Sequence, residues 1–174
     1  MSKFRFALHI IIPLIFLTAF SPSPAPARII RFSGYDWQVR DEKLGHPGPN
    51  NWKGTNVWLD SNGDLHLKIT QTDGNWHSAE VQTTLSLGFG EYQFQVVGRT
   101  DQLDPNVVLG LFSYPASNVG SDGSDEIDIE YTKWGDPQST DGNWTIYPAQ
   151  PEYGNAHETF PISLDGTYTT NRYT

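Results

Sequence analysis

Short turn signals recur along the chain after residue 27, and no run between them shows a helical period of useful length. The signals are pairs of Asn or Asp with Gly, at Asn62-Gly63, Asp73-Gly74, Asp122-Gly123, Asp141-Gly142 and Asp165-Gly166. Such pairs supply the positive φ angles and local hydrogen bonds that tight turns require. Many short strands at this spacing predict an all-β fold, either a sandwich or a barrel.

The clearest hairpin joins residues 56–60 to residues 64–70 through the turn Ser61-Asn62-Gly63. Residues 91–97 alternate apolar and polar side chains, which predicts a half-buried strand. Residues 107–114 are apolar on both faces, and this pattern is typical of a central strand. The sequence thus predicts a hairpin, a half-buried strand and a central strand in this part of the chain.

The first 27 residues have the pattern of a signal peptide rather than of folded structure. Lys3 and Arg5 form a basic n-region, residues 6–20 are apolar, and Ala25-Pro-Ala27 is an A-x-A cleavage pattern. An apolar run of about 15 residues is short for a membrane span, which favours cleavage over the alternative of an uncleaved anchor. We expect a secreted protein, extracellular or periplasmic, with its domain in residues 28–174 and no stable membrane association after cleavage.

Composition excludes several kinds of chemistry. The chain contains no Cys, which rules out disulfides, thiol nucleophiles and Cys-ligated zinc. Its formal net charge is −9, whereas nucleic-acid binding requires a basic patch. The His residues show no metal-ligand spacing, so we expect no metal and no cofactor. A neutral sugar polymer suits this acidic, aromatic-rich chain better than a phosphate backbone does.

The segment with the most specific chemistry is Asp125-Glu-Ile-Asp-Ile-Glu-Tyr131. On a strand, alternation places Glu126, Asp128 and Glu130 on one face and the side chains between them on the other, toward the core. Neighbouring carboxylates on that face lie roughly 6–7 Å apart and repel by roughly 2–3 kcal/mol. A glycosidase uses such a cluster, because one carboxyl must stay protonated near neutral pH while another stays ionised. These three residues are the predicted catalytic group.

Two other interpretations of the acidic stripe remain open, a solvated polar strand face and a calcium site. Residues 122–126 do not fit the EF-hand template, in which acidic or amide ligands alternate before a Gly. Trp134 stands four residues after Glu130 and is the predicted platform for a sugar ring, because sugar rings have apolar faces. For this Trp, as for the others, packing in the core is the alternative.

The chain resembles glycoside hydrolase family 16, which includes the bacterial lichenases and the plant xyloglucan-remodelling enzymes. The resemblance covers roughly residues 37–174 and is carried by Glu126-Ile-Asp-Ile-Glu130, Ser78-Ala-Glu-Val-Gln82, Phe89-Gly-Glu-Tyr92, residues 107–114 and residues 157–168. It implies a concanavalin A-like β-jelly roll of two curved antiparallel sheets, with the substrate cleft on the concave sheet. The motif's flanks, Ser124 before it and Tyr131-Thr-Lys-Trp-Gly135 after it, depart from the lichenase pattern, so the linkage cleaved stays open.

The resemblance also implies roles for individual residues. Glu126 would be the nucleophile, Glu130 the general acid/base, and Asp128 the residue that hydrogen-bonds between them. Glu80 and Asn143 would be polar substrate-binding residues of the cleft. The family's last strands have no counterpart before the end of this sequence, so we expect the catalytic domain in residues 28–174 to lack its C-terminal strands.

Three functions follow from these observations. The first is a secreted retaining endo-glycosidase that hydrolyses O-glycosidic bonds of a β-glucan-type polysaccharide. The second is a transglycosylase on the same scaffold, which favours a sugar over water as acceptor. The third is a non-catalytic carbohydrate-binding jelly roll, and the acidic trio argues against it because a lectin does not need one. The sequence leaves the oligomeric state open.

We predict that export removes residues 1–27, because the basic n-region, the apolar run and Ala25-Pro-Ala27 stand in the order that signal peptidase recognises. N-terminal sequencing of the exported protein should begin at Arg28. A full-length product that stays in the membrane fraction would contradict this prediction.

Overall fold

The computed structural model describes residues 27–115, 126–147 and 156–174, and these residues form β-structure only. The chain divides into two compact units, Met1–Thr84 and Leu85–Thr174, which are described separately below. Two short 3₁₀ turns, Gly54–Asn56 and Thr100–Gln102, are the helical elements within the described ranges. None of the helical turns found there has the length and hydrophobicity to cross a membrane.

The first unit contains nine short strands arranged as antiparallel sheets. Their bounds are β1 (Ile29–Phe32), β2 (Tyr35–Val39), β3 (Glu42–Gly45), β4 (Asn50–Trp52), β5 (Val57–Leu59), β6 (Leu65–Leu67), β7 (Thr70–Thr72), β8 (Asn75–His77) and β9 (Val81–Thr83). Strands β1, β2 and β9 form one sheet, and β3–β4, β5–β6 and β7–β8 pair in twos. The predicted hairpin is confirmed as β5–β6, with the turn residue Gly63 at a φ of 86°.

Buried hydrogen bonds hold the first unit together. Asn56 is 1% exposed, and its Nδ2 donates to His77 O and to Thr70 Oγ1, each at 3.0 Å. The Arg28 guanidinium donates to the carbonyls of Gly54 and Val57 at 2.6 and 2.8 Å. Because buried polar groups are stable only when they are hydrogen-bonded, the contacts of Asn56 hold it against Thr70 and His77, whereas Arg28 makes its bonds from an exposed position. Arg28, the first residue after the predicted cleavage site, is thus anchored in the fold; residues 1–26 lie outside the described ranges.

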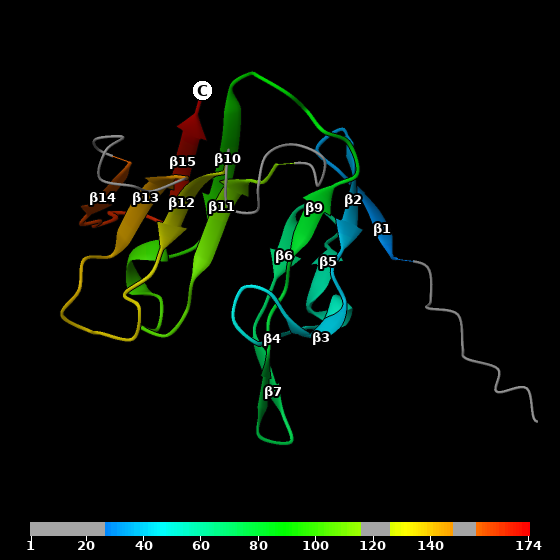
Figure 1. Ribbon diagram of the computed structural model, residues 1–174, viewed down its shortest axis with the longest axis horizontal. Coiled ribbons are helices and arrows are strands. Elements are labelled where there is room, and N and C mark those ends of the chain that lie inside the picture. Colours follow the sequence, from blue (N-terminus) through cyan, green and yellow to red (C-terminus); the bar gives the residue numbers. More distant parts are fainter. Residues whose placement is uncertain (1–26, 116–125, 148–155) are drawn as a thin grey trace, which may run out of the picture. The chain divides into compact units, whose positions relative to one another are not determined.

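The second unit contains a two-stranded and a four-stranded antiparallel sheet (Figure 1). Its strands are β10 (Tyr92–Val97), β11 (Leu109–Ser113), β12 (Ile127–Tyr131), β13 (Gly142–Ile146), β14 (His157–Phe160) and β15 (Tyr168–Tyr173). Strand β10 pairs with β15, and the larger sheet has the order β11-β12-β13-β14. Strand β10 confirms the predicted alternation, since Tyr92, Phe94 and Val96 are half-buried while the residues between them are exposed.

One strand prediction is wrong in its placement. Residues 107–114 were expected to form a central strand, but β11 lies at the edge of its sheet among the strands that the structure describes. Its second apolar face is not covered, because Phe112 on that face is 38% exposed. Only one apolar face of this strand is half-buried. The other face is apolar because it carries the exposed Phe112 side chain.

The acidic strand β12 is attached to the unit through its last residue. Tyr131 is 3% exposed, lies edge-on to Phe160 of β14 with ring centroids 6.1 Å apart, and hydrogen-bonds through its hydroxyl to Asn171 of β15. This side chain therefore ties the two sheets of the unit together, as expected for the core-facing positions. Ile127 and Ile129, on the same face, are half-buried.

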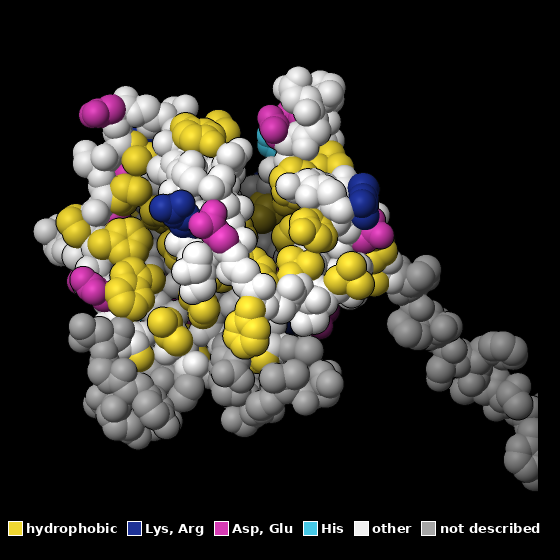
Figure 2. Space-filling view, turned by 90° about the horizontal axis from the view of Figure 1, so that it is seen from above, with side chains coloured by type: hydrophobic (Ala, Val, Ile, Leu, Met, Phe, Trp, Pro, Cys, Tyr) yellow, Lys and Arg dark blue, Asp and Glu magenta, His cyan; other side chains and the backbone are white. Residues whose placement is uncertain are grey.

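Large apolar side chains are common on the surface of the described residues. Those with relative exposure above 60% are Leu44, Trp76, Leu85, Phe89, Val97 and Trp134. Figure 2 shows hydrophobic side chains at many places on the face that it presents. An exposed aromatic residue is therefore weak evidence for a binding surface in this protein, and a site must be argued from what its neighbours do.

We predict that Gly142→Ala destabilises the protein by about 1–3 kcal/mol, because its side chain has no room. A Cβ at Gly142 would lie 2.7 Å from the Phe160 ring and 2.8 Å from the Glu130 carbonyl oxygen, and that backbone atom cannot move aside cheaply. The matched control is Gly110→Ala in the same sheet, where the nearest atom lies at 3.6 Å. Thermal melts should show a clear loss for the first variant only; equal melting temperatures would contradict the prediction.

Candidate active site

The register of the four-stranded sheet brings the predicted catalytic residues together on one face. Side chains of directly paired residues point to the same side of a sheet. One row across the sheet consists of Phe112, Asp128, Thr145 and His157, and the next consists of Gly110, Glu130, Asn143 and Thr159. The backbone N–H of Tyr147 donates to the Glu126 carbonyl at 2.9 Å, which extends the ladder and sets Tyr147 opposite Glu126.

Asp128 is the buried centre of the acidic stripe. It is 7% exposed, so a solvated polar strand face does not describe this position. Burial raises the pKa of its carboxyl to about 7, helped by the negative charges of Glu126 and Glu130 and by a hydrogen bond with Glu126. Asp128 is therefore protonated below neutral pH and donates that proton toward Glu126, which relieves part of the repulsion within the trio.

Glu130 is half-buried, and its environment acts on its carboxyl in both directions. Burial raises its pKa most, a hydrogen bond from Asn143 opposes this, the negative charge of Glu126 raises it, and His157 lowers it. The net result is a pKa above the usual value for Glu. A carboxyl with a raised pKa can hold a proton nearer to neutral pH, which is what a general acid requires.

Two residues predicted from the sequence form a chain of hydrogen bonds to Glu130: Asn143 contacts the carboxyl, and Trp134 contacts Asn143. With its amide oriented so that both ends find partners, Asn143 Nδ2 donates to Glu130 Oε2 at 3.1 Å. In the same orientation Asn143 Oδ1 accepts from Trp134 Nε1 at 3.2 Å. Asn143 is only 2% exposed, whereas Trp134 is 63% exposed, so the chain of hydrogen bonds runs from the surface to the buried carboxyl. Core packing, the alternative for Trp134, is wrong.

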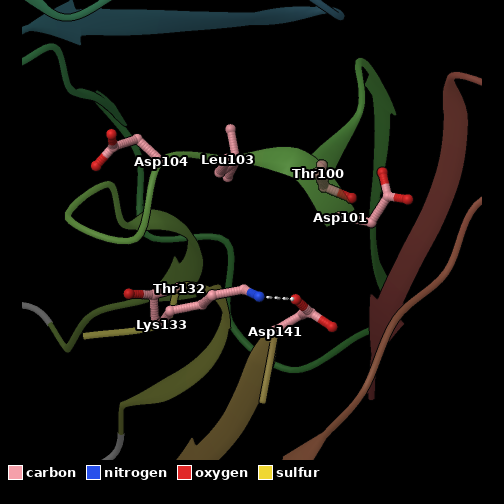
Figure 3. A pocket seen from close by; sticks show the side chains of 7 residues that line it. All are labelled: Thr100, Asp101, Leu103, Asp104, Thr132, Lys133 and Asp141. Atoms are coloured by element: carbon pink, nitrogen blue, oxygen red, sulfur yellow. Dashed lines mark ion pairs between the residues drawn. The ribbon is translucent and has the colours of Figure 1, made fainter. Parts of the chain in front are cut away.

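The loop that carries Trp134 is braced by its own hydrogen bonds. Trp134 has a positive φ of 49°, its N–H donates to Thr132 Oγ1 at 3.0 Å, and Gly135 N–H donates to Pro105 O at 2.8 Å. Lys133 forms an ion pair with Asp141 at 3.0 Å, beside a small pocket between the 100–104 segment and this loop (Figure 3). None of the three acids lines this pocket.

Three aromatic residues next to the acids were missed from the sequence. Phe112 and Tyr147 are opposite Asp128 and Glu126, and Tyr114 lies just beyond the end of β11. They are 38%, 39% and 55% exposed, in that order. Burial and then the charges of the three acids raise the pKa of the Tyr147 phenol. The alternation in Phe112-Ser-Tyr114 places Phe112 and Tyr114 on the same face of a strand. The sequence pattern could therefore have indicated these two residues, but residues 107–114 were predicted to be buried on both faces.

Glu80, the remaining predicted site residue, belongs to the first unit and has a partner there. Its carboxylate accepts from Arg40 Nη1 at 2.8 Å, and the Arg40 guanidinium lies 4.8 Å from the centre of the Trp52 ring. Burial raises the pKa of Glu80 while Arg40 opposes the change. This ion pair is a sufficient structural reason for a half-buried carboxylate, and its role in a cleft stays a prediction.

The positions of the His, Asp and Glu side chains give no evidence for a metal site among the residues that the structure describes. Within residues 27–115, 126–147 and 156–174, no group of three or more His, Cys, Asp or Glu side chains is placed to hold a metal ion.

Comparison with known proteins gives structural matches only. No family model matches the sequence, and no curated protein matches it either. A Bacillus licheniformis β-glucanase structure matches 86% of this chain and 69% of its own, with a TM-score of 0.60 and 20% identity. A Mycobacterium tuberculosis protein, Rv0315, described as an immunostimulatory antigen and pseudo β-1,3-glucanase, matches 78% of this chain and 58% of its own, with a TM-score of 0.54 and 25% identity.

These matches establish the fold. The chain has the all-β, antiparallel jelly-roll fold of the family 16 β-glucanases, as the resemblance implied. The same fold occurs in a protein described as a glucanase and in one described as a pseudo-glucanase. Fold alone therefore does not decide activity, which depends on the side chains on the acidic face.

We predict that Asp128→Asn stabilises the protein at pH 8 but not at pH 4. The pKa of Asp128 is about 7 in the folded protein and 3.8 as a model value, so between these values the folded state holds a proton that the unfolded chain has lost. The free energy of unfolding of the wild type therefore falls as pH rises through this window, whereas Asn cannot ionise. The gain at pH 8 should be on the order of 2 kcal/mol.

Thermal melts at pH 4 and pH 8 check this prediction. The matched control is Asp73→Asn at an exposed turn with a φ of 51°, a conformation that Asn also tolerates. The control should melt like the wild type at both pH values. An equal shift of Asp128→Asn at both pH values would contradict the prediction.

Proposed function

We propose that this protein is an exported glycoside hydrolase that cleaves a β-glucan-type polysaccharide with retention of configuration. One observation carries the proposal: a buried Asp128, whose pKa burial raises to about 7, lies between two glutamates on one face of a sheet. Glu126 is the nucleophile, Glu130 the general acid/base, and Asp128 the residue that restrains the nucleophile.

Glu126 and Glu130 carry out the reaction in two steps. In the first step Glu130 gives its proton to the glycosidic oxygen while the Glu126 carboxylate attacks the anomeric carbon, forming a glycosyl ester and releasing the leaving sugar. In the second step Glu130, now ionised, takes a proton from water as the water attacks the same carbon and frees Glu126. Two displacements at one carbon return the original configuration.

The spacing of the two glutamates is compatible with retention. Residues four apart on a strand have Cα atoms roughly 13 Å apart. Retaining carboxyls lie about 5–5.5 Å apart, and two long side chains that lean along the strand toward each other can close most of that difference. Asp128 stands between them and donates to Glu126, so the nucleophile keeps one oxygen for the substrate.

The aromatic residues around the acids support a sugar substrate. Phe112, Tyr114, Trp134 and Tyr147 are exposed and border the acidic face. Sugar rings offer apolar faces to such rings and hydroxyls to nearby polar groups, and Asn143 and Thr145 lie on the same face. The formal net charge of −9 suits a neutral polymer, and the structural likeness to a β-glucanase supports the β-glucan class.

Non-catalytic carbohydrate binding is the second candidate function. The observation that favours it is the likeness to a protein described as a pseudo β-1,3-glucanase. Under that function the aromatic residues would bind the sugar and the acids would carry out no reaction. The two candidate functions predict different results. A hydrolase turns over the glycan and loses this activity when Glu126 is replaced, whereas a non-catalytic protein binds the glycan without turnover.

We predict that the protein releases reducing sugars from one or more β-glucans and that Glu126→Ala abolishes this turnover. Azide should partly restore activity by taking the place of the nucleophile, giving a glycosyl azide of inverted configuration. Adding an oligosaccharide acceptor to the same assays separates hydrolysis from transglycosylation. An NMR time course of the wild type should show the retained anomer as the first product.

The matched control is Glu158→Ala, an exposed glutamate on β14 that is paired with Trp144 and so lies on the opposite face of the same sheet. This variant should act like the wild type. An inverted first product, or near-normal activity in Glu126→Ala, would overturn the mechanism. Sugar binding without any turnover across the panel would favour the second candidate function.

A further inference from the structure

The Asn143 amide has Glu130 at one end and Trp134 at the other, and Thr145 Oγ1 lies 3.4 Å from the end that faces Glu130. The contact with Trp134 defines which way the amide faces. The indole N–H of Trp134 is a donor only, so the Asn143 atom that meets it must be the amide oxygen. The NH₂ group then faces Glu130 and donates to Oε2. Asn143 is 2% exposed, so water is not at hand to replace either partner.

The direction of this amide decides where Glu130 can carry its proton. When Glu130 is protonated, Oε2 accepts from Asn143 and the proton therefore resides on Oε1. If the amide were turned by 180°, its oxygen would face Glu130 and accept the carboxyl proton at Oε2. The proton would then lie between Glu130 Oε2 and Asn143 rather than on Glu130 Oε1.

Trp134 is built to hold the amide in the first orientation. Its backbone has a positive φ of 49°, a conformation that non-glycine residues adopt only when their surroundings impose it. The hydrogen bonds from Trp134 N–H to Thr132 Oγ1 and from Gly135 N–H to Pro105 O impose it here. The indole edge is thus directed at Asn143 while the side chain as a whole remains 63% exposed.

We propose that Trp134 is a positioning residue that acts through Asn143 on Glu130. Its indole N–H orients the Asn143 amide, and the amide places the acid proton of Glu130 on Oε1. This inference rests on the proposed function of Glu130 as general acid and adds to it a residue that has no contact with that carboxyl. Trp134 therefore has two separate functions in this proposal. Its ring face can contact a sugar, and its indole N–H determines, through Asn143, which oxygen of Glu130 carries the acid proton.

Trp134→Phe tests the proposal, because it removes the N–H donor and keeps an aromatic ring, although a smaller one. We expect kcat on the polysaccharide to fall about tenfold, equivalent to about 1.4 kcal/mol, with KM within about twofold of the wild type. An aryl glycoside with an activated leaving group should be affected far less, because its departure needs no proton. Glu130→Gln should show the same selectivity with a larger loss.

The matched control is Trp76→Phe, at a tryptophan that is 62% exposed on β8 of the other unit. It should leave both substrates unchanged. A rise in KM with unchanged kcat in Trp134→Phe would show that Trp134 serves only as a platform and would overturn the proposal. An equal loss on both substrates would overturn it as well.

A measurement without substrate separates this proposal from the proposed function. The indole ¹H–¹⁵N signal of Trp134, identified by its loss in Trp134→Phe, should shift as Glu130 titrates. That shift should disappear in Glu130→Gln and in Asn143→Ala. If the wild type turns over no glycan, the proposed function fails and the titration still tests the relay. A Trp134 signal with the same pH dependence in Glu130→Gln as in the wild type would overturn the inference.

Discussion

Three carboxyl groups, that of Glu126 just before β12 and those of Asp128 and Glu130 within it, create a repulsion that the rest of the second unit must accommodate. Ionising all three in a partly buried setting would be costly, and protonation and hydrogen bonding reduce that cost. Asp128 holds a proton to about pH 7 and donates it toward Glu126. Glu130 accepts from Asn143, while its own burial keeps its pKa above the usual value. Burial of Asp128 and Glu130 thus raises the pKa of both carboxyls, and a carboxyl that holds a proton nearer to neutral pH is what general acid catalysis requires.

Strand β13 links this electrostatic arrangement to the fold. It places Asn143 opposite Glu130 and Thr145 opposite Asp128, and its first residue, Gly142, leaves the space that the Phe160 ring occupies. The Phe160 ring contacts Tyr131, which in turn hydrogen-bonds to β15. Packing on one face of the sheet therefore fixes the register that aligns polar groups on the other face. The braced loop at residues 132–135 then adds Trp134 from outside the sheet.

Burial is the point on which sequence patterns and structure differ most. The alternation of β10 and the hairpin β5–β6 were predictable, because each depends on a few adjacent residues and on the turn between them. The place of β11 at a sheet edge was not, because an apolar run looks the same whether its second face is covered by a layer or exposed beside a site. Glu80 shows the same limit. The resemblance implied a place in the cleft for Glu80, and its ion pair with Arg40, 40 positions away in the sequence, became visible only in the structure.

The sequence by itself determined that Glu126, Asp128 and Glu130 share a face, because the two-residue period of a strand is local geometry that holds wherever the strand lies. It also determined the all-β class, since turn residues and strand lengths are local as well. Only the tertiary structure decided that Asp128 would be the buried member, that Asn143 would join Trp134 to Glu130, and that Phe112 and Tyr147 would border the acids. Those properties depend on the pairing and register between separate strands, and a strand pattern does not specify its neighbour.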